Sequence, residues 1–421
     1  MVIIMDKFKL TKAERSWILY DVGNSAFILL VTTLVPIYFN SLAETTNLSS
    51  SEYLAYWGYA GSIATLLVAV IAPFFGTLAD RQDYKKKIFL VAVIIGAISC
   101  SILGFANNWL CFLLLFILAK TAYSSSLVFY DAMLPDLTEK NKMDRVSSHG
   151  YAFGYIGSCI PFILCLILVL FNEKLGIAMN TAMIFAFLIT AIWWVLFTVP
   201  LLKSYKQTKY IQSEASPVKE SFTRLISTFR NMKRQKSIFL FLLAFFFFID
   251  GVYTIIDMAT AYGTALGLDT AGLLLALLTT QIVAFPFAIL FGRLSSRYNT
   301  GTLIKICIIC YTGITLFAVF LRCQWQFWVL AICVGMFQGG IQALSRSYFA
   351  KIIPPECSGE YFGIYDIFGK GASFVGTTLV AVISHTFNNE SLGVSSIIII
   401  FIIGFVLFCK ADQCVRSQQS N

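Results

Sequence analysis

Residues 17–40 read WILYDVGNSAFILLVTTLVPIYFN, an apolar run that is long enough to cross a bilayer as a helix of about 20 residues. Four polar residues fall at helical spacing on one face of this helix, namely Asp21, Asn24, Ser25 and Thr32. A carboxylate at the centre of a membrane helix costs about 2.5–3.5 kcal/mol on insertion scales. The sequence therefore predicts that the polar face of this first span turns towards protein or water inside a bundle.

The composition of the chain points to a polytopic membrane protein. Of its 421 residues, 58% are hydrophobic and 13% are charged, which is more apolar surface than a soluble fold of this size can bury. The sequence has two histidines and eleven scattered cysteines, so we expect neither a metal site nor any other cofactor. The closest cysteine pair, Cys307 and Cys310, lies within an apolar run and is interpreted as two small apolar residues.

The order of apolar and polar segments predicts an all-α fold with twelve transmembrane helices. The expected spans are 17–40, 54–78, 88–106, 109–132, 149–171, 178–201, 238–262, 270–292, 302–321, 325–348, 360–386 and 393–409. A long polar break separates the first six spans from the last six. We therefore expect an N-terminal six-helix bundle at residues 1–202, a cytoplasmic linker at 203–236 and a C-terminal six-helix bundle at 237–421.

The distribution of lysine and arginine sets the expected orientation. Nearly all basic residues lie in the terminal segments, the linker and the loops on their side of the membrane, whereas the opposite side keeps Lys174 and Arg322. Because basic residues mark the cytoplasmic side, we expect both termini in the cytoplasm of a multi-pass protein in a bacterial-type inner membrane. The net charge of +9 thus reflects topology and contact with lipid headgroups, and no nucleic-acid partner is expected.

One loop carries a specific pattern of glycine, acid and base, because residues 76–87 read GTLADRQDYKKK. This loop resembles the signature of the major facilitator superfamily, which implies two parallel six-helix repeats with substrate bound between them near the midplane. Gly76 permits close approach of two helices, and Asp80 at a helix end suits a base or a helix N-terminus of the other half. Arg81 and the lysines after it are expected to stay in water. A second copy after the eighth span has Ser296 in place of the acid.

Three further stretches narrow the resemblance. They are WILYDVGNSAF at residues 17–27, LVFYDAMLPD at 127–136 with DRVS at 144–147, and QGGIQALSRS at 338–347. Together they resemble the family that includes the vacuolar amino-acid effluxers of fungal autophagy and their bacterial relatives. The chain departs from that family at Val22 and Gly23, where Trp and Ala are common, and at Ile249, where Asn is usual.

This resemblance implies a secondary active or facilitated transporter, not an enzyme, that moves a small polar metabolite by alternating access. Amino acids are the candidate substrates and protons the candidate coupling ion, since the sequence shows no nucleotide-binding loop. We expect a monomer in contact with membrane lipid. Two alternatives stay open. One is an exporter of drugs or of other metabolites, and the other is a transport-silent receptor or scaffold that binds a partner through residues 203–236.

Depth along the spans sorts the acidic residues, at about 1.5 Å per residue. Asp21 lies about 6 Å from the cytoplasmic end and is interpreted either as a gate residue or as a substrate ligand. Asp250 lies about 18 Å into the seventh span, where it suits proton coupling or a cationic group, the alternative being a structural ion pair. Asp257 lies nearer the outer end and is left out of the expected site.

Two lysines and two glutamines lie at a similar depth. Lys370 can pair with Asp366 one turn before it, whereas Lys120 needs a partner from another helix or a substrate carboxylate. Gln338 and Gln342 share one face of the tenth span, where they suit either a polar metabolite or hydrogen bonds between helices.

The expected site therefore has two parts. The substrate or proton pathway comprises Asp250, Lys120, Asn24, Gln338, Gln342 and Lys370. The cytoplasmic gate comprises Asp21, Gly76, Asp80, Arg81, Asp131, Arg145 and Arg346. Of the gate residues, four come from the stretches that narrow the family resemblance, namely Asp21, Asp131, Arg145 and Arg346.

Overall fold

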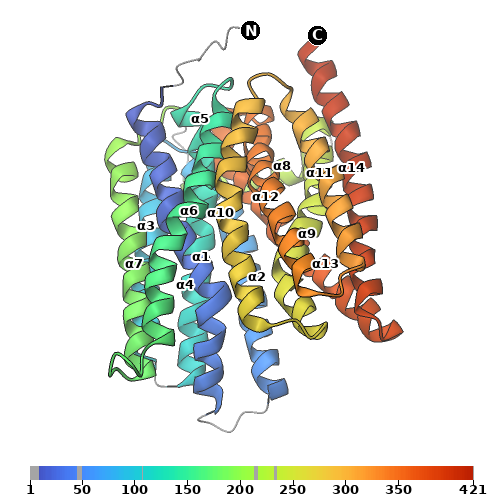
Figure 1. Cartoon of the computed structure of the whole chain (residues 1–421). Helices are drawn as coiled ribbons and strands as arrows, with labels where there is room; N and C mark the ends of the chain where they lie inside the picture. The colour runs from blue at the N-terminus through green and yellow to red at the C-terminus, as the bar shows by residue number, and fades with distance from the viewer. Residues whose placement is uncertain (1–8, 45–49, 107, 213–216, 232–234, 421) are drawn as a thin grey trace.

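The computed structural model describes residues 9–44, 50–106, 108–212, 217–231 and 235–420, and Figure 1 shows that this part of the chain forms a bundle of long helices. Twelve of the helices described are long and apolar enough to cross a membrane, as predicted. They are α1 (Lys12–Glu44), α2 (Ser50–Ala79), α3 (Tyr84–Leu103), α4 (Trp109–Ala132), α6 (Met143–Leu170), α7 (Met179–Ser204), α9 (Lys236–Ala265), α10 (Thr270–Leu294), α11 (Thr300–Val319), α12 (Gln324–Ile352), α13 (Ser358–Phe387) and α14 (Glu390–Ser420). Three short elements connect them, namely α5 (Leu134–Leu137), α8 (Pro217–Asn231) and η2 (Pro355–Cys357).

The start of α1 and the end of α14 lie at the same end of the bundle (Figure 1), which we call the termini side. Lys174, in the turn between α6 and α7, and Arg322, between α11 and α12, lie at the opposite end. We call α1–α7 the first group of helices and α9–α14 the second group.

Several helices are longer than the apolar runs that predicted them. The first helix begins at Lys12 instead of residue 17, and α14 continues to Ser420 instead of residue 409. Hydropathy marks the length of a helix that lies in hydrocarbon, whereas backbone hydrogen bonding can continue beyond it into water. The extra turns lie on the termini side, and in α14 they carry Asp412, which lies 2.6 Å from Lys305 of α11.

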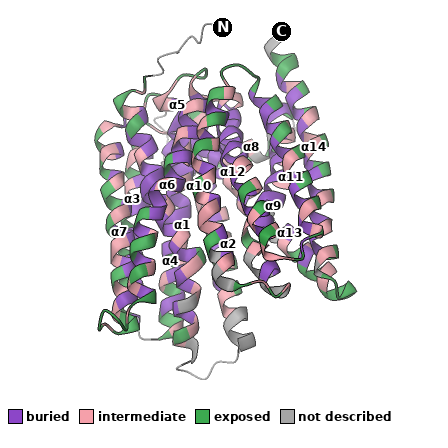
Figure 2. Cartoon of the chain, in the orientation of Figure 1, coloured by how far each residue is buried: buried purple, intermediate pink, exposed green. Residues whose placement is uncertain are grey.

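The outer surface of the bundle is apolar. Exposed and buried residues alternate along the outer helices, as the mixed colours of Figure 2 show, and many of the exposed residues are large and hydrophobic. Exposed examples include Leu66, Ile98, Leu114, Ile192, Leu196 and Ile399. Exposed apolar area of this extent marks a surface that meets another apolar phase, which for twelve candidate spans is lipid.

The two groups pack against each other mainly through three helix pairs. The second helix of the first group, α2, packs on α13, and α6 packs on α10 and α12. The short helix α8 lies against α2. These pairs meet on the termini side, and they bring together residues that are far apart in the sequence.

Candidate functional site

A buried arginine joins the two groups near the termini side. The Arg346 side chain of α12 is 3% exposed, and its Nη1 donates to Asp131 Oδ1 of α4 at 2.9 Å. Its Nη2 lies 3.5 Å from Asp21 Oδ2 of α1, and its Nε donates to Ser147 Oγ of α6 at 2.9 Å. The planar fork of a guanidinium allows one side chain to hold three helices of the first group to α12. We call these four residues the arginine cluster.

Aromatic rings surround the arginine cluster. The guanidinium carbon of Arg346 lies 4.6 Å from the ring centroid of Trp17, 5.4 Å from that of Tyr130 and 4.4 Å from that of Tyr151. Tyr130 also donates a hydrogen bond to Asp21 Oδ2 at 2.7 Å. The ring faces attract the cation and exclude water, so the ion pairs act in a medium of low dielectric constant.

Part of the polar face of α1 packs against protein. Asp21 is buried, and its Oδ1 accepts a hydrogen bond from Asn24 Nδ2 at 3.1 Å. A Cβ at Gly150 of α6 would crowd the Asp21 carboxylate, so glycine is what leaves room for it. Ser25 is half-buried and Thr32 is exposed, so the face opens to its surroundings towards the side opposite the termini.

The loop that resembles the superfamily signature is seated on the start of α13. Asp80 Oδ1 accepts from the Gly359 N–H at 2.6 Å, and Asp80 Oδ2 accepts from the Glu360 N–H at 3.0 Å. Amides in the first turn of a helix have no partner within the helix, and the helix N-terminus attracts an anion. Gly76 lies so close to Gly359 that a Cβ on either residue would overlap the carbonyl oxygen of the other. We call this arrangement the α2–α13 contact; its role as a gate remains a prediction.

Two basic residues of the same loop are not in water, and the sequence-based expectation for them is wrong. Lys85 is fully buried, where its Nζ lies 3.0 Å from Asp136 Oδ2 and donates to Ser358 Oγ at 2.8 Å. The Arg81 side chain is 12% exposed and lies 3.4 Å from Glu220 Oε2. The expectation failed because α8 and the start of α13 cover the loop, and the local sequence carries no sign of either.

We expect the α2–α13 contact to tighten as the pH falls. Burial raises the pKa of the Asp80 carboxyl to about 7, although Lys85, the Glu360 and Gly359 amides and Arg224 act in the opposite direction. When the contact opens, Asp80 meets water and its pKa returns to an ordinary value of about 4. The packed form therefore binds a proton more tightly than the open form. Packing should strengthen as the pH falls through about 7 and should change little above about 8.

Hydrogen exchange in the first turn of α13, corrected for the intrinsic effect of pH, measures this dependence. Protection of the Gly359 and Glu360 amides should rise between about pH 8 and about pH 6. The Asp80→Asn variant has no carboxyl to titrate and should lose that rise. A protection that is independent of pH in the natural chain, or a rise that persists in Asp80→Asn, would contradict the prediction.

The linker contributes to the same contact through α8. Arg224 Nη2 lies 2.8 Å from Glu360 Oε2 and 3.8 Å from Asp80 Oδ2. A residue of the linker thus bridges an acid of the first group and an acid of the second. Arg224 was not predicted as a site residue, because its partners lie in distant parts of the sequence, after α2 and at the start of α13.

A second acid joins the groups where α6 packs on α10 and α12. Asp144, in the first turn of α6, accepts hydrogen bonds from three side chains of the second group. They are Thr300 Oγ1 at 2.6 Å, Ser347 Oγ at 2.6 Å and Lys351 Nζ at 2.5 Å. Asp144 belongs to the DRVS motif at residues 144–147 but was not among the predicted gate residues.

This second contact repeats the close glycine packing of the first. Gly292, at the end of α10, lies against Ser148 and against the backbone of Arg145, which the sequence placed in the gate. The position where the signature would have its acid is Ser296, which is exposed and donates to a backbone carbonyl in its own turn. The acid beside this glycine contact is Asp144 of α6, whose hydrogen bonds go to α11 and α12.

Charged side chains from both groups meet at mid-depth. Lys370 of α13 lies 2.7 Å from Asp366 Oδ1, the pair that its spacing predicted, and its Nζ reaches the Ser124 carbonyl of α4 at 3.5 Å. Lys120 of α4 lies over the Phe116 ring at 5.8 Å and interacts electrostatically with Asp257 of α9 and with Lys370. Asp257, which the sequence left outside the expected site, is exposed and lies within electrostatic range of Lys120. An acid on the seventh span that matches the depth of Lys120 was the available signal.

The two glutamines of α12 line the same interface. Gln342 Oε1 lies 3.4 Å from the Tyr155 hydroxyl of α6, and both Gln338 and Gln342 are buried. Gln342 thus makes a hydrogen bond between helices, which is one of the two roles left open for it.

Asp250 lies apart from these residues. Its side chain is 0% exposed and faces α13, where Oδ1 accepts from the Gly376 N–H at 2.9 Å and from Thr254 Oγ1 at 3.4 Å. Its other oxygen, Oδ2, is buried and has no hydrogen-bond partner within the described part of the chain. The sequence suggested a structural ion pair as one alternative, and none is found for Asp250 among the described residues.

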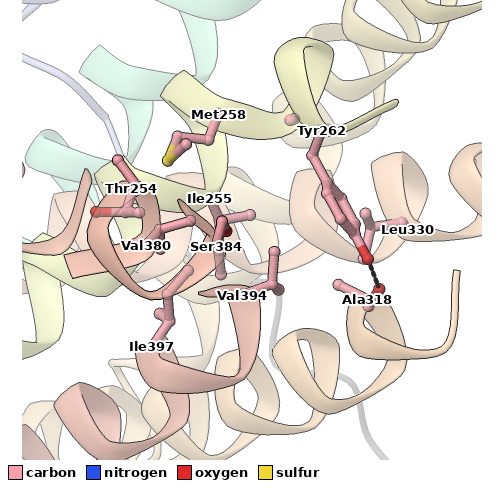
Figure 3. A pocket seen from close by; sticks show the side chains of 12 residues that line it. Thr254, Ile255, Met258, Tyr262, Ala318, Leu330, Val380, Ser384, Val394 and Ile397 are labelled. Carbon is pink, nitrogen blue, oxygen red and sulfur yellow. Dashed lines mark hydrogen bonds between the residues drawn. The ribbon is translucent and has the colours of Figure 1, made fainter. Parts of the chain in front are cut away.

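A cavity of about 190 Å³ begins one helical turn beyond Asp250 (Figure 3). Its walls come from the second group alone, so it is not the space in which the two groups meet. The lining residues include Thr254, Met258, Tyr262, Leu330, Val380 and Ile397. Tyr262 donates to the Ala318 carbonyl at 3.1 Å, so the walls present almost no free polar group.

Comparison with known sequences places the chain in a family. The family described as "Vacuole effluxer Atg22 like" matches residues 11–419. An uncharacterized MFS-type transporter of Bacillus subtilis, YxiO, is 43% identical over 98% of both chains. Autophagy-related protein 22 of Coccidioides immitis is 22% identical over 85% of this chain and 72% of its own length.

Solved structures give the same fold. The fucose transporter FucP in the outward conformation aligns with a TM-score of 0.73 over 95% of this chain and 97% of its own, at 15% identity. The human organic anion transporter MFSD10 aligns with a TM-score of 0.72 over 94% of this chain and 99% of its own, at 13% identity. The chain therefore belongs to the Atg22-like family and is a transporter of the major facilitator superfamily, not an enzyme.

Proposed function

We propose that the protein is a secondary active or facilitated transporter that carries a small polar metabolite by alternating access, with amino acids as the first class to test. Its proposed place is the bacterial plasma membrane, with the termini side in the cytoplasm, because the basic residues gather on that side. In the arrangement described, the contacts of Arg346, Asp80 and Asp144 would then close the cytoplasmic entrance.

The observation that carries this proposal is the set of charged residues at mid-depth. Lys120 belongs to the first group, and Lys370, Asp366 and Asp257 belong to the second. The Lys370 and Asp366 side chains are 27% and 15% exposed, and Asp257 is also exposed. Charges in the middle of a membrane protein face water or protein and not lipid. These charged side chains therefore suggest a hydrated space between the two groups of helices.

The chemistry of these residues suits a zwitterion. A lysine ammonium binds a carboxylate, and the Asp257 carboxylate binds an ammonium, which are the two charged groups of an amino acid. Because Lys120 and Lys370 repel each other, an anionic group of the substrate between them would be favoured. A site for cationic drugs would not need two lysines, and this disfavours the drug-exporter alternative.

Flux in proteoliposomes tests the proposal directly. Labelled amino acids should enter vesicles that contain the purified chain, and uptake should be compared with and without a pH gradient. If no labelled amino acid moves, the substrate class is wrong; if no polar metabolite moves under any gradient, the receptor or scaffold alternative gains support.

Replacing Lys120 by methionine should lower uptake about ten- to a hundredfold at low substrate concentration. An ionic hydrogen bond contributes about 1.5–3 kcal/mol, and each 1.4 kcal/mol is a factor of ten in binding. Lys174→Met is the matched control, because Lys174 is an exposed lysine on the side opposite the termini. Equal uptake by the natural chain and Lys120→Met would remove Lys120 from the site.

A further inference from the structure

We propose that Asp250 is the proton-binding carboxyl of the transport cycle, and that it holds a proton in the arrangement described here, in which the termini side is closed. The inference rests on the proposed transport function and adds the group through which a proton gradient would act. It follows from how Asp250 is buried, from what surrounds it and from what its two oxygens contact.

The two carboxyl oxygens of Asp250 have different environments. Oδ1 accepts two hydrogen bonds, from the Gly376 N–H and from Thr254 Oγ1. Oδ2 is shielded from solvent and has no donor within the described residues. An ionised carboxylate needs donors or a counter-charge at both oxygens when it is buried. A protonated carboxyl, with the hydrogen on Oδ2, needs much less.

Among the described residues, no counter-charge to Asp250 is found on the helices that pack on α9. From α13 it meets the Gly376 amide, while Asp366 pairs with Lys370 and Glu360 pairs with Arg224 on the termini side. From α14 the Phe401 ring packs at the neighbouring Gly251 and stacks on the Tyr311 ring of α11.

The charged groups of α9 and α12 near this level interact with other residues. On α9 itself, Tyr253 and Asp257 interact with charges at the interface of the two groups, and Asp257 interacts with Lys120. On α12 the charged side chains, Arg346 and Lys351, lie on the termini side with Asp131 and Asp144. The interactions found for Asp250 are those with Gly376 and Thr254, so a proton is the cation that suits Oδ2.

The site is built so that small movements of α13 would expose it. Gly376 is in such close contact that a Cβ there would overlap Thr254 Oγ1 and crowd Asp250 Oδ1. Thr254 also lines the cavity of about 190 Å³ on the side opposite the termini (Figure 3). Because that cavity leaves space between α9, α13 and α14, these helices can shift without first displacing packed side chains.

The proposed step is a simple exchange of a proton. When α13 moves away from α9 and water reaches the carboxyl, the O–H bond at Oδ2 breaks and the proton passes to that water. Once the protein has opened to the other side of the membrane, a proton from water on that side forms the bond anew. No other bond changes, and the net result of a cycle is one proton carried from one side to the other.

Infrared difference spectroscopy tests the protonation without any transport assay. The spectrum of the natural chain minus that of Asp250→Asn, near neutral pH, should contain the carbonyl band of a protonated carboxylic acid. Asp269→Asn is the matched control, because Asp269 is exposed at the start of α10 and caps it. A difference spectrum without that band, or with the bands of a carboxylate, would overturn the proposal.

Flux measurements then separate this inference from the proposed function. In Asp250→Asn, accumulation driven by a pH gradient should fall to the level of vesicles without a gradient, whereas exchange of labelled for unlabelled substrate should continue. Asp250→Glu should restore part of the accumulation. If the natural chain moves no substrate, the proposed function fails while the infrared result still stands. If Asp250→Asn accumulates substrate as the natural chain does, the coupling role of Asp250 is wrong.

Discussion

Replacing Arg346 by alanine should open the termini side of the protein. Breaking one side of a buried ion pair costs about 3–5 kcal/mol, because the partner charge stays buried without compensation. Here two carboxylates are affected, because Asp21 and Asp131 both lose their cation and then repel each other. Because these contacts join helices of the two groups, the cost falls on the closed arrangement far more than on one in which water reaches both carboxylates.

Distances between spin labels measure the opening. Lys140, between α5 and α6, and Tyr298, between α10 and α11, are exposed on the termini side and belong to different groups. The distribution of distances between labels at these positions should shift to longer values in Arg346→Ala. Arg346→Lys should give an intermediate shift, because an ammonium keeps the charge but not the fork of donors.

A second substitution checks that the effect is electrostatic. Adding Asp131→Asn to Arg346→Ala removes one of the two stranded carboxylates, so it should recover part of the closed population. An unchanged distance distribution in Arg346→Ala, in a variant that remains folded, would show that the arginine cluster does not hold the two groups together.

Valine at Gly76 should have an effect of similar size through shape alone. A Cβ at this position would overlap the Gly359 carbonyl, which belongs to the backbone of α13 and cannot rotate away. Overpacking a tight contact typically costs about 1–3 kcal/mol, and a clash with backbone lies at the upper end of that range or beyond it. The cost applies only while α2 and α13 are packed, so the variant should fold and should populate the open arrangement.

The same helix supplies the control for this variant. A Cβ at Gly58, also in α2, would meet nothing within 4 Å, so Gly58→Val should leave the distance distribution and the flux unchanged. Gly76→Val should lengthen the distance between the labels at Lys140 and Tyr298 and should slow flux. If both variants behave alike, close packing of α2 on α13 is not what closes the termini side.

The sequence predicted those features that depend on local pattern. Hydropathy predicted the twelve spans because a helix in lipid is stable only when its surface is apolar along its whole length. The spacing of Asp366 and Lys370 predicted their ion pair, since residues four apart are neighbours on any helix.

Features that depend on packing between distant helices were beyond this kind of prediction. The position of Lys85 in a run of lysines suggested water, yet Asp136 and Ser358 bury it. The depth of Asp250 was estimated from its place along the span, but depth does not tell which neighbour a side chain faces, and here it faces α13. Each of these outcomes is fixed by rotation of a helix about its axis, which hydropathy determines poorly when a span is apolar on most sides.

The positions of Asp80 and Asp144 bear on how the two halves of the protein could diverge in evolution. At the α2–α13 contact the acid is Asp80, at the end of α2, and at the second glycine contact it is Asp144, at the beginning of α6. If the two halves are regarded as copies of one ancestral unit, the acid has moved from one helix of the contact to the other, while the closely packed glycine has stayed in place. A lineage can make that exchange through an intermediate that carries both acids. A comparison of the two halves position by position would find that the second copy of the signature loop lacks its acid, although the glycine contact beside it is still closely packed.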